Sequence, residues 1–234
     1  MAGRVSSLRE ALREGRRLRG TFVKLPAPEV VEIAADVLDF AIVDLEHSQL
    51  AEAEALRLVR HAWALRFPAL LRVHELDRSL VNRVLEAGAA GIQLSSVRSA
   101  AEVRALRDAC LYAPEGTRSI SLAHGPARYG ALSLADYLAA LEPPILVVQI
   151  ETAETEDPLE AILGAGADIV FVGVTDLALE YGLDQERVRA RVDEVVAAAA
   201  LAGVAFGGFG DDERFRYAVA SSDLALLRKA YADG

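Results

Sequence analysis

The chain has 234 residues, of which 53% are hydrophobic, and it carries a formal net charge of −10. This negative charge argues against a nucleic-acid or an anionic-membrane partner, and no apolar run reaches the roughly 18–20 residues that span a bilayer. A single cysteine, Cys110, excludes an internal disulfide and a CxxC metal site. The Arg-rich N-terminus contains Glu10 and Glu14 and has no long apolar core. It is therefore interpreted as the solvated first helix of a cytoplasmic protein rather than as a targeting segment.

Short β-branched or apolar runs alternate with segments of helical period along the whole chain. This alternation predicts parallel strands joined by right-handed crossovers, and eight strands in about 230 residues favour a single (β/α)8 TIM barrel domain over residues 1–234. No glycine-rich phosphate-binding fingerprint follows the first strand, which counts against a dinucleotide-binding α/β fold. The strands are predicted at 21–24, 39–44, 68–73, 90–94, 144–150, 168–173, 204–209 and 216–221, and the helices at 27–36, 51–65, 78–87, 98–110, 133–141, 154–164, 186–202 and 223–232.

The connection between the seventh and eighth predicted strands is unusually short. Only residues 210–215 separate these two strands, whereas a crossover to a parallel strand normally needs a dozen or more residues. The helix between strands seven and eight is therefore predicted to be missing, and the barrel is expected to be imperfectly closed at that place.

Polar and charged side chains follow four of the predicted strands. In a barrel of this kind, active sites form where the strands end and the strand-to-helix loops begin. Four polar endings on one rim predict a polar cavity there. They are Asp44, Glu46 and His47 after the second strand, Arg72 in the third, Gln149 and Glu151 in the fifth, and Asp176 after the sixth.

The residue types on this rim indicate a particular chemistry. Glu151 and Asp176 are hard oxygen donors without a histidine beside them, which favours Mg²⁺ or Mn²⁺ over zinc. Arg72 cannot act as a base, and it suits an anionic substrate or a developing oxyanion. Histidine is the side chain most often used to carry protons at physiological pH, and Asp44 could orient His47 for this role. Together these groups suit proton abstraction next to a carbonyl group.

Each of these residues also has a purely structural interpretation. Asp44 and His47 could be a helix-capping acid and a loop histidine. Glu151 and Asp176 could cap the helices that follow them, because carboxylates are favoured at helix N-termini. Arg72 is harder to explain in this way, since a buried guanidinium without a partner is costly.

The sequence resembles the HpcH/HpaI aldolase/citrate lyase family over nearly its whole length. This family contains metal-dependent (class II) aldolases that act on 4-hydroxy-2-oxo acids and 2-keto-3-deoxy sugar acids, and its barrel is of the pyruvate/phosphoenolpyruvate-binding type. The resemblance is carried by "TFVKLPAPEVVEIAA" (21–35), "DFAIVDLEHSQL" (39–50), "LLRV" (70–73), "AGAAGIQL" (87–94), "APEGTRS" (113–119), "VVQIET" (147–152), "FVGVTDLALEYG" (171–182) and "SSDLALLRKA" (221–230).

The resemblance implies a reversible aldol reaction, in which a 4-hydroxy-2-oxo acid is cleaved to pyruvate and an aldehyde through a metal-bound enolate. A divalent Mg²⁺ or Mn²⁺ ion would be held by Glu151 and Asp176. Arg72 would stabilise the enolate at the keto oxygen. His47, paired with Asp44, would move protons for the aldehyde partner.

The resemblance also assigns residues to the bound keto acid. Gln149 would donate a hydrogen bond to it or to a metal-bound water, and the backbone N–H groups near Gly173 and Val174 would receive its carboxylate. Glu46 would support the metal site from a second layer of contacts.

This sequence departs from the family pattern at several positions. Val174 follows the glycine of "FVG", where the family usually has proline. Ser95 and Ser96 stand after the fourth strand, where proline is also usual, and Ser119 replaces a glycine. These changes bear on substrate choice, but they remove none of the expected metal ligands.

Two other functions stay open at this point. One is an acyl-CoA lyase of the citrate-lyase type, although the chain has no obvious basic cluster for a CoA phosphate tail. The other is a non-catalytic keto-acid-binding barrel. The expected partners are a small keto acid and an aldehyde, and the resemblance implies a homo-oligomer, specifically a hexamer.

Overall fold

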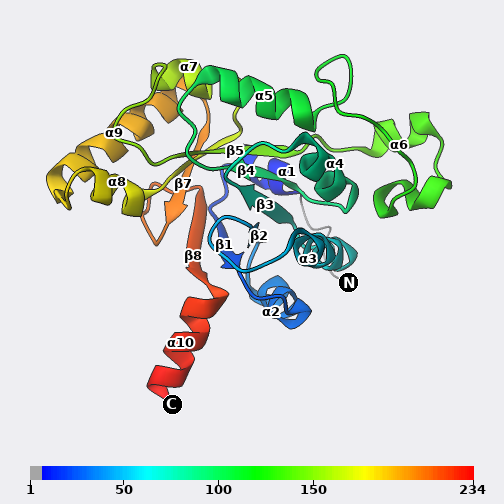
Figure 1. Ribbon diagram of the computed structural model, residues 1–234, viewed down its shortest axis with the longest axis horizontal. Helices are drawn as coiled ribbons and strands as arrows, with labels where there is room; N and C mark the ends of the chain where they lie inside the picture. Colours follow the sequence, from blue (N-terminus) through cyan, green and yellow to red (C-terminus); the bar gives the residue numbers. More distant parts are fainter. Residues whose placement is uncertain (1–6) are drawn as a thin grey trace.

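Eight parallel strands form a closed barrel in sequence order in the computed structural model, which describes residues 7–234 (Figure 1). The predicted TIM-type barrel is therefore confirmed, and the strands lie close to the predicted ranges. They are β1 (Leu18–Val23), β2 (Phe40–Asp44), β3 (Ala69–Val73), β4 (Gly91–Leu94), β5 (Ile145–Ile150), β6 (Ile169–Val172), β7 (Ala205–Phe209) and β8 (Tyr217–Ser222).

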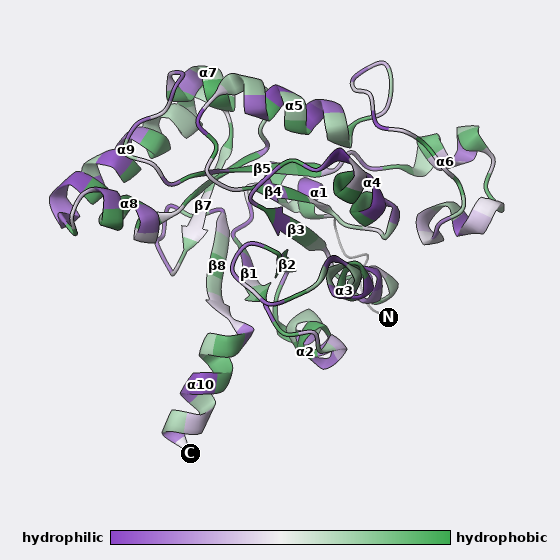
Figure 2. Cartoon of the chain, viewed as in Figure 1, coloured by the Kyte–Doolittle hydropathy of each residue, from purple (hydrophilic) through white to green (hydrophobic). Residues whose placement is uncertain are grey.

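Helices separate most of the strands and form the outer layer. Figure 2 shows hydrophilic and hydrophobic residues alternating along these helices, and α4, for example, buries Leu80, Val81, Val84 and Leu85. The sequence patterns did not predict α8 or the short 3₁₀ helix η1. The helices are α1 (Leu8–Arg13), α2 (Pro28–Val37), α3 (Glu52–Ala64), α4 (Arg78–Glu86), α5 (Ala100–Cys110), η1 (Gly125–Gly130), α6 (Leu134–Ala140), α7 (Leu159–Leu163), α8 (Val174–Glu180), α9 (Gln185–Ala202) and α10 (Asp223–Asp233).

The interior of the barrel is a separate apolar cluster. Alternate residues of each strand point inward, so that Phe40 and Ile42 of β2 pack with Leu70 of β3 in this cluster. The Phe40 ring stacks on that of Tyr217, with centroids 4.0 Å apart. Gly20 of β1 makes this possible, because a Cβ atom there would lie 2.3 Å from the Phe40 ring.

The barrel closes without a helix between β7 and β8. The missing helix is confirmed, but the expectation of an imperfectly closed barrel is wrong, because β7 and β8 pair in parallel from Gly207↔Tyr217 onward. Phe215 of the short connection is buried and packs against Phe206, with ring centroids 5.2 Å apart. Gly208 admits the Phe215 ring, which a Cβ atom would approach to 2.4 Å. The Phe215 side chain thus packs against β7 at the position where a helix would otherwise cover the barrel.

The N-terminal helix differs from the expected solvated helix. Residues 1–6 of the N-terminal segment lie outside the described residues, and α1 begins at Leu8. Leu8 and Ala11 are buried and belong to the cluster inside the barrel. The helix therefore packs against the barrel interior at the end where the strands begin.

The C-terminal helix α10 extends away from the barrel (Figure 1). Its large apolar side chains Leu224, Leu226, Leu227 and Tyr231 are exposed. Within residues 7–234 no helix combines the length and the apolar character that a bilayer crossing requires. The homo-oligomer stays a prediction.

Candidate active site

The alternation of inward and outward residues also determines which side chains lie at the carboxyl ends of the strands. This end of the barrel is called the upper rim, and the end where the strands begin is called the lower end. In β2, Phe40, Ile42 and Asp44 are alternate residues and lie on the same, inward side of the strand. In β3, Leu70 and Arg72 are related in the same way. Asp44 and Arg72 are register partners on neighbouring strands. The apolar interior therefore ends in a charged layer at the carboxyl ends of the strands.

Arg72 and Asp44 form a buried two-pronged ion pair in this layer. The Nε and Nη2 atoms of Arg72 donate to the two carboxylate oxygens of Asp44 over 2.9 and 2.6 Å. The Arg72 guanidinium also lies 4.3 Å from the centre of the Phe22 ring. Both charged residues are buried, with exposed fractions of 5% and 0%, so the orientation of the guanidinium is fixed.

The environment of Asp44 keeps it ionised. Burial opposes ionisation, but the hydrogen bond and charge of Arg72, the backbone N–H of His47 and the charge of Lys24 together lower the pKa of Asp44 below its ordinary value. Its Oδ1 atom accepts hydrogen bonds from the backbone N–H groups of Glu46 and His47 over 3.0 and 3.2 Å.

The predicted pairing of Asp44 with the imidazole of His47 is wrong. Asp44 contacts the backbone of His47, while its carboxylate is committed to Arg72. The imidazole is largely exposed, and its Nε2 atom lies 3.9 Å from Oε2 of Glu46. Glu46 is therefore the carboxylate beside the ring.

Glu46 lies between the second, third and fourth strands. Its Oε1 atom accepts a 2.6 Å hydrogen bond from the Ser95 hydroxyl and lies 3.2 Å from Nδ1 of His74. Its Oε2 atom is buried and has no hydrogen bond among residues 7–234, but it lies 3.4 Å from Nη1 of Arg72. The structure thus places Glu46 beside Arg72 and His47.

Glu151 is held by the fourth and fifth strands. Its Oε1 atom accepts hydrogen bonds from the backbone N–H and the hydroxyl of Ser96 over 2.8 and 2.6 Å, and Nε2 of Gln149 donates to its Oε2 atom. A Cβ atom on Gly173 would lie only 2.5 Å from this oxygen. Ser95 and Ser96, which depart from the family pattern, therefore each hold a carboxylate of the rim.

A cavity of about 340 Å³ opens onto this layer. Two predicted site residues, Asp44 and Glu151, are buried next to it and bonded to Arg72 and Gln149 of its lining. The other predicted catalytic, substrate-binding and metal-binding residues line it: His47, Arg72, Gln149, Gly173, Val174 and Asp176.

The structure contains no ready-made cluster of metal ligands in the part of the chain that it describes. Within residues 7–234 no group of three or more His, Cys, Asp or Glu side chains is placed to hold an ion. The two predicted ligands differ in environment, because Glu151 is buried and hydrogen-bonded whereas Asp176, in the first turn of α8, is exposed.

Several residues of the rim were missed by the sequence patterns. Lys24, directly after β1, places Nζ 3.2 Å from Oδ2 of Asp44, and Gln93 of β4 donates to Oε1 of Gln149 over 2.7 Å. Lys24 carried a usable signal, since it is a charged residue at a strand end and only two of the 25 basic residues in the chain are lysines. Gln93 interrupts the apolar strand "GIQL", which was a weaker signal.

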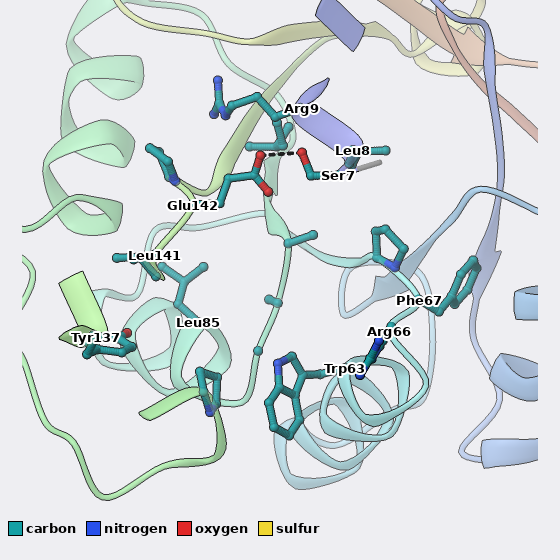
Figure 3. A pocket seen from close by; sticks show the side chains of 17 residues that line it. Ser7, Leu8, Arg9, Trp63, Arg66, Phe67, Leu85, Tyr137, Leu141 and Glu142 are labelled. Atoms are coloured by element: carbon teal, nitrogen blue, oxygen red, sulfur yellow. Dashed lines mark hydrogen bonds between the residues drawn. The ribbon is translucent and has the colours of Figure 1, made fainter. Parts of the chain in front are cut away.

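Figure 3 shows a second hollow. It lies at the opposite end of the barrel, because residues that begin or directly precede β3, β4 and β5 line it. It is lined largely by apolar and aromatic side chains, which include Trp63, Phe67 and Tyr137. Glu142 accepts a hydrogen bond from Ser7 over 2.5 Å there. This end of the barrel has none of the predicted catalytic residues.

Comparison with known proteins identifies the family of this chain. A model of the HpcH/HpaI aldolase/citrate lyase family matches residues 19–221. A hydroxypyruvate/pyruvate aldolase of Rhizorhabdus wittichii is 30% identical over 97% of this chain and 96% of its own length. A 4-hydroxy-2-oxovalerate aldolase of Novosphingobium aromaticivorans is 32% identical over 76% of this chain and 69% of its own length.

A solved structure is similar over nearly the whole fold. The crystal structure of an HpcH/HpaI aldolase from Desulfitobacterium hafniense shares 27% identity and superposes with a TM-score of 0.87, covering 97% of this chain and 95% of that one. The chain therefore belongs to the HpcH/HpaI aldolase/citrate lyase family and is a carbon–carbon lyase of the aldolase type.

Proposed function

We propose that the chain is a divalent-metal-dependent aldolase that reversibly cleaves a 4-hydroxy-2-oxo acid to pyruvate and an aldehyde. One observation carries this proposal. The guanidinium of Arg72 is buried, held in one orientation by Asp44, and lines the same cavity as Gln149 and Asp176. A rigid cation beside a carboxylate and an amide suits a keto acid whose keto oxygen gains negative charge.

The donor groups of the rim fit a divalent metal ion. Mg²⁺ is often held by one or two carboxylates and completes its shell with water and substrate oxygens, and Glu151 and Asp176 would supply the carboxylates. The absence of a side chain on Gly173 leaves Oε2 of Glu151 uncovered on that side. When bound, the ion would act as a Lewis acid toward the keto acid.

Arg72 would stabilise the charge that develops when pyruvate loses a methyl proton. The electrons of the broken C–H bond move toward the keto oxygen, and the guanidinium donates hydrogen bonds to that oxygen. Because Arg72 stays protonated, it can hold this charge but cannot take the proton. Asp44 would keep the guanidinium aimed at the cavity.

His47 would handle the proton on the aldehyde side. Its imidazole is exposed at the cavity and lies near Glu46, which can stabilise the protonated ring. In the cleavage direction the histidine would take the proton of the 4-hydroxyl group, and in the addition direction it would return that proton to the new alkoxide.

Exchange of the pyruvate methyl protons in heavy water tests this proposal by NMR. We expect exchange with Mg²⁺ or Mn²⁺ and its loss when a chelator is added. Asp176→Asn should raise the metal concentration needed for half-maximal exchange at least about tenfold, because it removes a charged ligand.

Two results would contradict the proposal. Pyruvate binding without any exchange under each metal would favour a keto-acid-binding barrel without turnover. Exchange that persists at full rate after removal of all metal would contradict the metal dependence. Circular dichroism of each variant would show that it is folded.

A further inference from the structure

We propose that Lys24 selects a carbonyl acceptor that carries a carboxylate group, such as a 2-oxo acid or glyoxylate. This inference rests on the proposed aldolase function and concerns the second substrate, which reacts with pyruvate. It assigns a specificity-determining role to Lys24, which lies in the stretch 21–35 that resembles the family but has no role assigned from that resemblance.

The backbone fixes Lys24 at the rim. Leu18, Gly20 and Phe22 of β1 alternate with outward residues, and Lys24 continues the same alternation toward the cavity. The backbone N–H groups of Lys24 and Leu25 both donate to Oδ2 of the buried Asp223 over 2.8 and 2.9 Å. The base of the side chain is therefore held in place by the first residue of α10.

The ammonium group makes one hydrogen bond and one ion pair within the protein. Its Nζ atom lies 3.2 Å from Oδ2 of Asp44 and donates to the backbone carbonyl of His47 over 3.1 Å. No third oxygen partner is present among residues 7–234. The ammonium also lies 5.8 Å from the centre of the Phe22 ring. Because an ammonium has three N–H donors, this partly buried cation, 19% exposed, still has hydrogen-bonding capacity for a ligand.

Lys24 and His47 lie where two cavities meet. The cavity of about 340 Å³ contains Arg72 and the expected pyruvate-binding groups. The adjoining cavity of about 590 Å³ is lined by Lys24, Leu25, Pro26, His47, Ser48, Gln49, Glu54 and Leu224. A second substrate that approaches bound pyruvate from this outer cavity passes both the imidazole and the ammonium group.

Lys24 is the cationic side chain of the outer cavity. The carboxylate there, Glu54, already accepts a hydrogen bond from the backbone N–H of Ala51 over 2.8 Å. A compact ammonium on a flexible stem can follow a small carboxylate, whereas a guanidinium would demand a planar fork. The chain otherwise relies on arginine, with Lys229 as its second lysine.

The contact of the Lys24 ammonium with the backbone carbonyl of His47 places the two residues side by side at the cavity, and this favours a carboxylate directly next to the reacting carbonyl. In the addition direction, a bond forms between the pyruvate methyl carbon and the acceptor carbonyl carbon, and the carbonyl π bond breaks. The proton lost by the methyl group is balanced by one gained on the acceptor oxygen, so that no oxidant or reductant is needed. His47 would serve that oxygen while Lys24 binds the neighbouring carboxylate.

The test compares two acceptors of similar size, anionic glyoxylate and neutral glycolaldehyde, with pyruvate as donor. We expect wild-type kcat/KM to favour glyoxylate. Lys24→Met should reduce the ratio of the two kcat/KM values roughly 10- to 100-fold, as expected for the loss of a charge-assisted hydrogen bond. Lys24→Arg, which keeps the charge, should restore part of this preference. The matched control Lys229→Met, on the exposed surface of α10, should leave the ratio unchanged.

The outcomes separate this inference from the proposed function. If Lys24→Met lowers kcat/KM equally for both acceptors, Lys24 only positions its neighbours and the inference is overturned. The same holds if wild type has no preference for glyoxylate although pyruvate exchanges its methyl protons. If wild type shows no exchange at all, the proposed aldolase function itself fails. Thermal unfolding of Lys24→Met would identify a variant that has lost its fold, and Lys24→Arg then decides the question.

Discussion

The two ends of the barrel each contain a two-pronged Arg–Asp ion pair, but in different surroundings. At the end where the strands begin, Arg9 donates to the carboxylate of Asp168 over 2.5 and 2.8 Å and to the carbonyl of Pro144 over 2.9 Å. At the end where they finish, Arg72 donates to Asp44 over 2.9 and 2.6 Å.

The partners around each pair differ. Asp168 also accepts a hydrogen bond from the backbone N–H of Leu146. The lower pair, Arg9 with Asp168, therefore connects α1 to the beginning of β5. The upper pair is bordered by Lys24, Glu46 and an open cavity. Arg9 also lines the hollow shown in Figure 3, so neither an ion pair nor a neighbouring cavity indicates function by itself. What distinguishes the upper pair is the further charged groups that lie beside it.

The comparison predicts the largest effect for a change of Arg72. Arg72→Lys keeps the positive charge but loses the planar guanidinium, which can donate hydrogen bonds to Asp44 and to the keto oxygen at the same time. We expect the rate of pyruvate methyl exchange to fall about 100-fold or more, as measured by NMR. An unchanged rate would mean that the upper pair is as purely structural as the lower one.

Arg9 should show the opposite pattern. Arg9→Ala removes the contact between α1 and Asp168, and we expect the free energy of unfolding to fall by about 2 kcal/mol in urea titrations. Methyl exchange by the folded variant should stay within about twofold of wild type at low temperature. A large loss of exchange in a fully folded Arg9→Ala protein would break the distinction between the two ends.

The smallest effect concerns pH. The pKa of Asp44 is lowered from its ordinary value of 3.8, so the stability contributed by its carboxylate is complete above the unfolded-state pKa and is lost as the pH falls through the lower folded-state pKa. The difference in unfolding free energy between wild type and Asp44→Asn should therefore be constant near neutral pH and shrink below about pH 4. A difference that grows on acidification would show that Asp44 is not held as an anion.

The strand order and most of the site could be predicted because local patterns determine them. The apolar runs that form β2 and β5 place Asp44, Gln149 and Glu151 at their ends, and the alternation of side chains then turns these residues inward. Barrel topology brings all strand ends to one rim. No distant contact had to be known for these predictions.

The pairing of the charges could not be predicted in the same way. Asp44 binds Arg72 because the register of β2 and β3 makes them neighbours, and this register is a property of the assembled barrel. His47 is near Asp44 in the sequence, but the turn directs its backbone rather than its ring toward the carboxylate. The burial of Phe215 beside β7 could not be predicted either, because it depends on the space that Gly208 leaves for the ring in the folded barrel.

The pairing of β1 with β8 has a consequence for how the chain folds. Leu18 is the register partner of Tyr217, so the last hydrogen-bonded seam joins segments from opposite ends of the sequence. During synthesis, the backbone N–H and C=O groups on one edge of β1 stay unpaired until β8 has been synthesised. Such an exposed strand edge can pair with other chains. The seven-residue link from β7 shortens the final step, because β8 needs to close only a small loop to reach β7 and then meets β1 beside it.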